Sequence, residues 1–486
     1  HPAMAEVKYV HQNVGFEAID AASGKFRITN RFYFTNLKKY QIHYSVLSNN
    51  KTIKSGKVSL DIAPQASKEF TVPVNGLKSQ PGTEYFVNFS VTTVEPEPLI
   101  PAGYEIAYDQ FQLPIQAEKR IYKANGPALT TATSGDELTV SSSKVNFVFN
   151  KKSGLVTSYK VDGTEYFKDG FGIQPNFWRA PNDNDYGNGA PKRLQVWKQS
   201  SKNFHVTDVN MTTENKVVLL KATYLLAAGN LYVVTYRIYP SGIVNVSAQF
   251  TSTDMQAAET EVSEATRMAT FTPGSDAARK AASKLEVPRI GVRFRLPAQM
   301  NNVQYFGRGP EENYIDRNHG TLVGVYKTTA DKMYFNYVRP QENGHHTDTR
   351  WIALSPDKGN GLAIVADSLI GFNALRNSIE DFDSEEALPH PYQWNNFSPE
   401  EVANHDEKAA RNVLRRMHHV NDITPRDFVE VCVDMKQQGV GGYDSWGARP
   451  EPFHQIPANR DYSWGFTLVP VRSASQANEV AKYDYQ

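Results

Sequence analysis

The chain has 486 residues, and its 52 basic and 52 acidic side chains give a formal net charge of +0. Hydrophobic residues make up 40% and aromatic residues 12% of it, which is typical of an ordered globular protein of roughly two to four domains. The charge balance argues against a nucleic-acid or anionic-membrane partner, which would require a basic surplus. No stretch approaches the ~18 apolar residues of a transmembrane helix, and residues 1–8 lack the apolar core of a signal peptide.

Residues 1–113 are expected to form one domain. Short segments of alternating polarity recur there at roughly ten-residue spacing, separated by Gly, Pro and Asn turns. The expected strands lie at residues 25–34, 41–47, 58–62, 69–74 and 84–91. This pattern predicts an antiparallel β-sandwich of about a hundred residues. The chain has a single cysteine, so any likeness to an immunoglobulin domain depends on the strand pattern.

Residues 114–135 show no clear periodicity and are expected to be a linker, followed by a second, larger domain at residues 136–486. A hairpin is predicted for residues 145–161, with Gly154 at its turn. Further strands are expected at residues 217–224, 231–239, 243–250 and 428–433, the last with Cys432 as a small buried side chain. Residues 276–285 are helix-prone after Ser275 as a possible N-cap, and residues 255–272 are expected to be a loop. No alternation of strand and helix appears, so the chain is predicted to be all-β.

The densest polar stretch runs from Tyr305 to Trp351 and interleaves Arg, Glu, Asp, Asn and His with aromatic residues. Turns are expected at Gly307–Pro310 and at Asn343–Gly344. Such interleaving indicates side chains that bond to one another near a partly buried floor. The stretch is therefore expected to be either a structural network or the lining of a site.

Arginines and carboxylates in this stretch and upstream of it are candidates for either role. Glu311 and Glu312 are adjacent and would point to opposite faces of a strand, so they would not form a catalytic pair. The planar fork of arginine suits carboxylates, and buried ion pairs are the favoured interpretation. The residues concerned are Arg179, Arg308 and Arg350, with Asp183, Asp185, Glu342 and Asp348 as their carboxylate candidates.

Neither histidine pair has the spacing of a metal site. His345 and His346 would face opposite ways on a strand, as would His418 and His419, and no second cluster stands at ligand spacing. Residues 182–185, Asn-Asp-Asn-Asp, are rich in oxygen and could hold Ca²⁺. They lack the spacing and the terminal Glu of a Ca²⁺ loop, and turn formation explains them equally well. No metal site is expected in this chain.

Three long motifs occur in order along the second region. They read NFWRAPNDND (176–185), GRGPEENYIDRNHG (307–320) followed by YVRPQENGHHTDTRW (337–351), and GVGGYDSWG (439–447). Together they resemble the last domain of the large multidomain β-galactosidases of glycoside hydrolase family two. The resemblance is firm over residues 136–486 and implies an antiparallel supersandwich like that of galactose mutarotases. It extends less firmly over the first hundred residues, where it implies an immunoglobulin-like domain.

The resemblance also has implications for catalysis. A retaining β-galactosidase needs two carboxylates about 5 Å apart, and this family carries them on a (β/α)₈ barrel, which takes about 250 residues. No segment has that alternation, so both catalytic glutamates and the Mg²⁺ and Na⁺ sites of the parent enzyme are expected to lie outside this chain. The chain alone is therefore expected to be inactive. Residues 1–8 resemble the junction that follows the barrel, with a cloning scar as the alternative.

Trp446 is the candidate substrate-binding residue. It stands between Gly441-Gly442 and Gly447, a poor place for an ordinary core side chain, and an aromatic face suits the apolar side of a sugar ring. The resemblance implies that this position lines the galactoside pocket. Tyr443 departs from the family pattern, which usually has Asp there. The alternative is a tryptophan packed at a domain interface.

Three functions are compatible with these observations. In the first, the chain is part of a β-galactosidase, with the missing N-terminal and barrel domains as partners and a homo-oligomer as the assembly. In the second, it is a freestanding carbohydrate-binding module. In the third, it is an aldose epimerase with His319 as acid and Glu342 as base, although no mutarotase motif surrounds these two residues. The natural glycan and the compartment, cytoplasm or bacterial periplasm, are left open.

Overall fold

The computed structural model describes residues 1–252, 285–383, 419–444 and 447–485. β-Strands dominate these ranges, and the longest described helix has seven residues, so the all-β prediction is confirmed. None of the described helices has the length and apolar character needed to cross a bilayer. The expected helix at 276–285 and the expected loop at 255–272 lie outside the described residues, except for Leu285.

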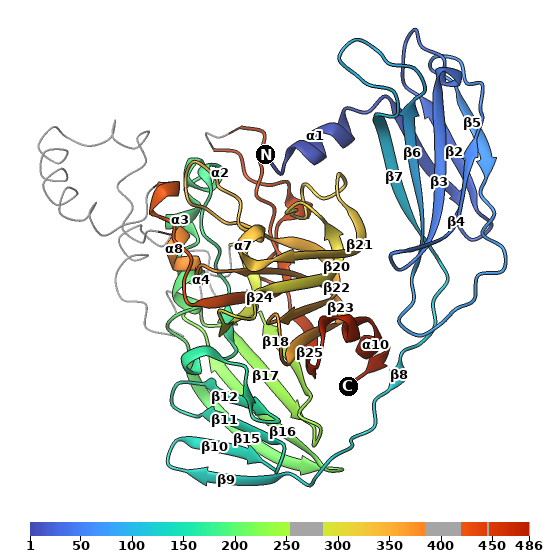
Figure 1. Ribbon diagram of the computed structural model, residues 1–486. Helices are drawn as coiled ribbons and strands as arrows, with labels where there is room; N and C mark the ends of the chain where they lie inside the picture. Colours follow the sequence, from blue (N-terminus) through green and yellow to red (C-terminus); the bar gives the residue numbers. More distant parts are fainter. Residues whose placement is uncertain (253–284, 384–418, 445–446, 486) are drawn as a thin grey trace, which may run out of the picture.

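The first part of the chain forms a β-sandwich of two antiparallel sheets, here called the first sandwich (Figure 1, blue). The three-stranded sheet has the order β1-β2-β5, with β1 at Val14–Asp20, β2 at Lys25–Asn30 and β5 at Ser67–Thr71. The four-stranded sheet has the order β4-β3-β6-β7, with β3 at Tyr40–Ser48, β4 at Lys51–Val58, β6 at Tyr85–Thr93 and β7 at Glu105–Leu113. Aromatic rings fill the space between the sheets; Phe26 and Phe89 pack edge to face at 5.0 Å.

Two predicted strands of the first sandwich need correction. The strand expected at 25–34 ends at Asn30, because the buried Asn30 amide donates to the carbonyls of Thr35, Ile62 and Ala63 and so holds a turn. Phe34 is consequently 97% exposed. The strand expected at 58–62 lies earlier in the chain, as β4 at Lys51–Val58. The lysines and the serine of β4 do not produce the apolar alternation by which strands were predicted.

The predicted linker is partly β-structure. β8 (Arg120–Ile121) pairs in parallel with β26 (Tyr483–Asp484) near the C-terminus. β9 (Thr130–Ser134) pairs with β10 and is the edge of the next sheet. Segments this polar and short carry little periodicity, so no strand was predicted for them.

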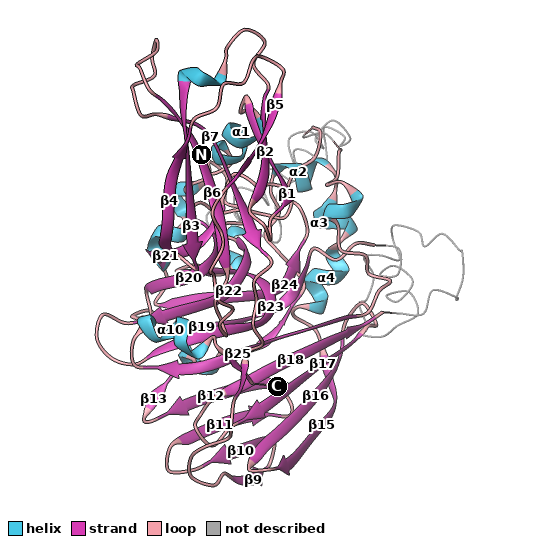
Figure 2. Ribbon diagram, turned by 90° about the vertical axis from the view of Figure 1, so that its right-hand side faces the viewer, coloured by secondary structure: helices cyan, strands magenta, loops and turns pink. Residues whose placement is uncertain are grey.

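The rest of the chain forms a larger antiparallel assembly, here called the supersandwich. One layer has the order β13-β12-β11-β10-β9, with β10 at Glu137–Ser141, β11 at Val145–Asn150, β12 at Leu155–Val161 and β13 at Thr164–Glu165. This confirms the hairpin predicted at 145–161. This five-stranded layer packs on the second layer, which is described next (Figure 2). For example, the rings of Phe147 and Tyr236 lie with their centroids 5.6 Å apart.

The other layer is a twelve-stranded sheet with the main path β14-β19-β24-β23-β25-β18-β17-β16-β15, to which β20 and β21 are joined through β22. Its strands are β14 (Gln174–Asn176), β15 (His205–Glu214), β16 (Val217–Leu225), β17 (Leu231–Ile238), β18 (Val244–Thr251), β19 (Arg289–Pro297), β20 (Asn302–Gly309), β21 (Leu322–Thr329), β22 (His346–Ser355), β23 (Gly361–Leu375), β24 (Phe428–Gln437) and β25 (Tyr462–Val471). The strands expected at 217–224, 231–239 and 243–250 are thereby confirmed.

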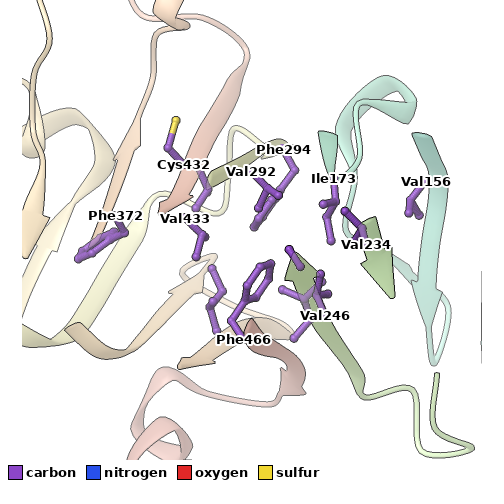
Figure 3. Close-up of a cluster of buried hydrophobic side chains, with 14 of the residues drawn as sticks. Val156, Ile173, Val234, Val246, Val292, Phe294, Phe372, Cys432, Val433 and Phe466 are labelled. Carbon is purple, nitrogen blue, oxygen red and sulfur yellow. The ribbon is translucent and has the colours of Figure 1, made fainter. Parts of the chain in front are cut away.

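The core of the supersandwich lies between these layers and along the central strands (Figure 3). Cys432 is 2% exposed, as predicted for a small buried side chain. The alternation expected around it is absent: the residues of β24 from Val429 to Asp434 are all buried. A strand covered on both faces loses the alternating pattern of a half-exposed one.

Helices are short and sit at the ends of strands. They are α1 (Met4–Val10), α2 (Asp183–Gly187), α3 (Ala190–Arg193), α4 (Gln195–Ser200), α7 (Ala330–Met333), α8 (Ile379–Phe382) and α10 (Ala477–Val480), with 3₁₀ turns at Leu37–Lys39, Lys168–Gly170, Val420–Asp422, Pro452–His454 and Ala474–Gln476.

The first sandwich contacts the supersandwich through apolar groups, such as Phe86 against Phe306, and through polar groups. The Tyr108 hydroxyl donates to the Gly320 carbonyl at 2.7 Å. The Gln110 side chain bonds both the N–H and the C=O of Val323, at 2.8 and 2.9 Å. These bonds join β7 to the start of β21 and fix how the two parts meet.

Candidate functional site

Segment 439–448, here called the GG loop, makes hydrogen bonds through its backbone with side chains of the other recognised motifs. Arg179, which is buried, donates through Nη2 to the Gly439 carbonyl at 3.1 Å and to Asp185 Oδ1 at 2.9 Å. The guanidinium thus holds the first residue of the loop while its charge is balanced by a buried carboxylate. Arg179 acts as a support of the loop.

The Asn-Asp-Asn-Asp tetrad is a helix cap that also grips the GG loop. Asn182 is the N-cap of α2: its side chain accepts from the Asp185 N–H, and the Asp185 carboxylate accepts from the Asn182 N–H in a capping box. The amides of Asn182 and Asn184 both donate to the Val440 carbonyl, at 2.9 and 3.2 Å. Turn formation, one of the two explanations for this tetrad, therefore accounts for its buried oxygens.

Asp316 holds the GG loop from the motif at 307–320. Its Oδ2 accepts from the Gly441 N–H at 2.7 Å. A Cβ on Gly439 would lie only 2.6 Å from the same oxygen, and one on Gly442 would lie 2.8 Å from the Ala448 carbonyl. A side chain at Gly442 would therefore meet the backbone of the loop itself, whereas one at Gly439 would meet the end of the Asp316 side chain.

Two residues of the GG loop, Ser445 and Trp446, lie outside the described residues. The described residues before and after them are bonded to each other: Asp444 Oδ1 accepts from the N–H groups of Gly447 and Ala448, at 3.1 and 3.2 Å. The sugar-binding role of Trp446 stays a prediction.

A cluster of buried charges lies under the same motifs. Arg289, fully buried on β19, is 2.8 Å from Glu342 Oε1 and 3.3 Å from Asp434 Oδ2. Burial raises the pKa of Glu342, and it raises the pKa of Asp434 to about 7, while Arg289 acts in the opposite direction on both. The Glu342 N–H donates to the Ala180 carbonyl at 3.2 Å, which ties this cluster to the segment that carries Arg179.

Glu342 and His319, cast above as an epimerase pair, have separate surroundings. Glu342 is 5% exposed and engaged with Arg289, whereas His319 is mostly exposed and lies 3.5 Å from Glu6. Burial lowers the pKa of His345 well below its ordinary value, and that of His346 to about 4. Both of these histidines are therefore neutral and packed on aromatic rings, His345 on Tyr314.

The two adjacent glutamates do not lie on a strand, so the premise about their opposite faces was wrong. β20 ends at Gly309. Glu311 is exposed, while Glu312 is buried and accepts from the Gly344 N–H at 2.7 Å, from Arg317 at 2.7 Å and from the Tyr337 hydroxyl.

The turn expected at Gly307–Pro310 is also wrong, because Gly307 to Gly309 belong to β20. Glycine is needed there for close approach: a Cβ on Gly309 would lie 2.3 Å from the Tyr305 hydroxyl oxygen. At the turn expected at Asn343–Gly344, no hydrogen-bonded turn is assigned; the backbone bends at Glu342, and Gly344 has a φ of +67°.

The remaining predicted site residues lie apart from the GG loop contacts. Arg308 pairs with Asp348 at 2.5 Å and also donates to two backbone carbonyls. Arg350 pairs with Glu84 of the first sandwich at 2.7 Å, a partner 266 residues away that the sequence did not indicate. Asp183 is exposed and is 3.4 Å from Arg339.

A groove of about 520 Å³ lies beside the tetrad that grips the GG loop. It is lined by His1, Asn182, Asp183, Asn184, Phe335, Asn336, Tyr337, Val338, Arg339 and Gln341. Val338 is 88% exposed at its edge. No group of three or more His, Cys, Asp or Glu side chains in the described ranges is arranged to hold a metal ion.

Two residues of this site were missed in the sequence, Asp316 and Asp434. Asp316 lies inside a recognised motif and was available as a candidate. Asp434 lies within β24 and, like Glu430 on the same strand, is a buried acidic residue. The position of such residues becomes informative only when the strand is known to be covered on both faces.

Comparison with known proteins gives two family matches. The model of the β-galactosidase small chain matches residues 141–468, and that of β-galactosidase domain 4 matches residues 26–114. A β-galactosidase of Priestia megaterium is 32% identical over 473 residues, which cover 97% of this chain and 40% of that protein. A β-galactosidase of Streptococcus thermophilus is 25% identical over 476 residues, which cover 97% of this chain and 39% of that protein. The chain thus spans about 40% of the length of these curated relatives.

Solved structures with a similar fold include galactose 1-epimerase from Lactobacillus acidophilus NCFM. That similarity has 8% identity, covers 72% of this chain and 98% of the other, and has a TM-score of 0.33. A galactose mutarotase related enzyme from Lactobacillus acidophilus is 8% identical in sequence. That similarity covers 70% of this chain and 98% of the other, and has a TM-score of 0.33. Both TM-scores are below 0.5, so neither similarity supports a conclusion about this chain.

Proposed function

Because the chain belongs to the β-galactosidase small-chain family, we propose that it is the C-terminal, non-catalytic part of a glycoside hydrolase family two β-galactosidase. The intact enzyme hydrolyses terminal β-D-galactosides. The matched relatives are β-galactosidases, and more than half of their length has no counterpart in this chain. We propose that the catalytic glutamates lie in that remainder, in a (β/α)₈ barrel, with the Mg²⁺ and Na⁺ ions of the parent enzyme.

The observation that carries this proposal is the shared support of the GG loop. Arg179, Asn182 and Asp316 come from two separate recognised motifs, and each bonds the backbone of the third motif. Buried bonds of this kind are costly to lose, and they hold the backbone of the loop at Gly439, Val440 and Gly441. A loop held in this way is suited to presenting one large side chain, Trp446, to a sugar ring in a pocket completed by the barrel.

The groove beside the tetrad extends the same face. It combines exposed Val338 with Phe335, Tyr337 and amide groups. An apolar and aromatic edge with polar groups around it is the composition of a surface that another domain covers. We propose that this face meets the barrel, and that further surfaces of the chain make homo-oligomer contacts in the parent enzyme.

The first test is hydrolysis of a chromogenic β-galactoside by the purified chain. No turnover above buffer is expected, because the catalytic glutamates are proposed to lie in the part of the parent enzyme that this chain does not contain. Sustained turnover that survives repurification would contradict the proposal. Glu311, Glu312, Glu342 and Asp348 would then be replaced in turn.

The second test places Trp446→Ala in the full-length enzyme. The KM for the galactoside should rise roughly tenfold or more, since an aromatic platform and its apolar burial are lost, while the unfolding midpoint stays unchanged. Phe453→Ala is the matched control, because Phe453 is an aromatic residue 71% exposed outside the GG loop. An unchanged KM for Trp446→Ala would remove this residue from the pocket.

A further inference from the structure

A second cavity, of about 400 Å³, lies where the first sandwich, the connector after it and the supersandwich meet. It is lined by Gly82, Thr83, Glu84, Gln112, Gln116, Ala117, Lys119, Phe306, Arg350, Trp351, Ala366, Asp367, Ser368, Leu369 and Ala481. It shares no lining residue with the groove beside the GG loop. Its size falls within the roughly 300–1,000 Å³ of small-molecule sites, which occur preferentially at domain interfaces.

The cavity exists because β22 and β23 separate at one point. Trp351 pairs with Val365, but the next pair on that side is Thr349 with Ile370. Residues 366–369 therefore face the single residue Arg350 and bulge out of the ladder. Bulges of this kind redirect side chains next to functional sites, and here the bulge forms one wall of the cavity.

The other walls are fixed by bonds between distant segments. Arg350 donates to both carboxylate oxygens of Glu84, at 2.8 and 2.7 Å. Lys119 Nζ donates to the Ala366 carbonyl at 3.0 Å. Beyond it, β8 is paired with β26 through the bond from Arg120 N to Lys482 O at 2.9 Å. A cavity whose walls are already bonded requires little ordering when a ligand enters.

The lining combines balanced charge with an aromatic floor. Lys119 and Arg350 are offset by Glu84 and Asp367, so a small ion of either sign would meet a like charge. Gln112 and Gln116 add amide donors and acceptors. At the floor, Phe306 packs against Trp351 with ring centroids 6.3 Å apart.

Trp351 contributes its aromatic ring to this lining. Its indole Nε1 is buried, so the ring and not the N–H is what a ligand in the cavity would meet. The cavity therefore suits a neutral molecule that carries many hydroxyl groups, which both donate and accept, together with apolar C–H faces for the rings.

We propose that this cavity binds a neutral mono- or disaccharide, as a second carbohydrate site of the chain. The inference stands on the cavity alone and does not require that the chain belong to a galactosidase. It also predicts a site present in the isolated 486-residue chain, whereas the face that carries the GG loop is proposed to be completed by another domain.

Saturation-transfer NMR of the chain with D-galactose and with lactose tests this site. We expect saturation transfer to at least one of the two sugars. Ser368→Trp fills the cavity from the bulge, outside the strand ladder, and should weaken binding roughly tenfold or more. Ser134→Trp is the matched control on exposed β9 and should leave binding unchanged.

The remaining outcomes decide against the proposal. Absence of transfer to both sugars would overturn it, as would sugar binding that Ser368→Trp leaves unchanged. Inorganic phosphate that binds in competition with the sugars would overturn the assignment to neutral ligands. Trp446→Ala should not alter this binding, so failure here and failure of the galactosidase proposal are separately visible.

Discussion

The first sandwich and the supersandwich place their charges in opposite ways. In the first sandwich, Arg27 lies between Glu17 and Glu69, and all three side chains are between 38% and 62% exposed. In the supersandwich, Arg289 is 0% exposed and lies between Glu342 and Asp434, which are 4% and 0% exposed. The same arrangement of one arginine and two carboxylates thus occurs once in water and once in a core.

The difference indicates what the buried charges do. An exposed network adds little to stability because water and salt screen it. A buried one is costly to desolvate, and it persists where its groups fix a particular geometry. In the supersandwich that geometry is the segment from Arg179 to Asp185 and, through it, the GG loop. Replacing one member of each network tests this contrast.

Arg289→Met should have the largest effect. It leaves Glu342 and Asp434 buried without their cation, and we expect a loss of about 3–5 kcal/mol of unfolding free energy. Urea unfolding measures it. Arg27→Met in the exposed network is the matched control and should leave the unfolding curve unchanged. Equal effects of the two substitutions would contradict the distinction between the two sandwiches.

Arg350→Met tests the contact between the two parts and should have an intermediate effect. The bidentate pair with Glu84 is partly buried, with side chains 13% and 21% exposed. Loss of one partner is expected to cost about 1–3 kcal/mol and to speed proteolysis in residues 114–118. A double variant with Glu84→Gln should cost less than the sum of the single variants. Additive costs would show that the pair does not couple the two parts.

Asn182→Ala removes a helix cap and should cost about 1 kcal/mol. It also removes the bond to the Val440 carbonyl, so hydrogen exchange should accelerate at the amides of the GG loop. Asn36→Ala is the control, because Asn36 caps a 3₁₀ turn in the first sandwich and is only half-buried. Unchanged exchange in the GG loop would contradict the role assigned to Asn182.

The same contrast explains what the sequence predicted well. Half-exposed strands such as β11, β12 and β16 to β18 alternate in polarity, and their positions were predicted. Polar β4 and fully buried β24 do not alternate, so the first was misplaced and the second misinterpreted. Periodicity reports exposure on one face, and a strand that is exposed or buried on both faces carries no such signal.

Site contacts were predictable to the extent that they are local. The Asn182–Asp185 cap is contained in four residues, and its turn chemistry was a stated alternative. Arg350 was expected to pair with a carboxylate, but which carboxylate depends on how the first sandwich contacts the supersandwich. The residues that flank Arg350 or Glu84 in the sequence give no indication of that contact.

The smallest expected effect is a pH dependence at the boundary between the two parts, where His319 lies 3.5 Å from Glu6 of α1. The bond to Glu6 raises the pKa of His319 above 6.5, and burial only partly opposes it. Burial acts to raise the pKa of Glu6, but bonds from His319 and the Gly320 N–H outweigh it and lower that pKa below 4.5. His319 and Glu6 are therefore both charged between pH 4.5 and pH 6.5.

The sign of the effect follows from these shifts. A raised histidine pKa stabilises the fold fully below pH 6.5, and this contribution is lost as pH rises through the folded pKa. The lowered Glu6 pKa stabilises it above pH 4.5, and this contribution is lost as pH falls through the folded pKa. The wild type should therefore exceed His319→Gln in unfolding free energy at about pH 5.5 and match it at about pH 8.5. Because the His319 side chain is 64% exposed, screening keeps the difference small. A difference that grows with pH would contradict this assignment, and one that vanishes in high salt would place the pair with the exposed network of Arg27.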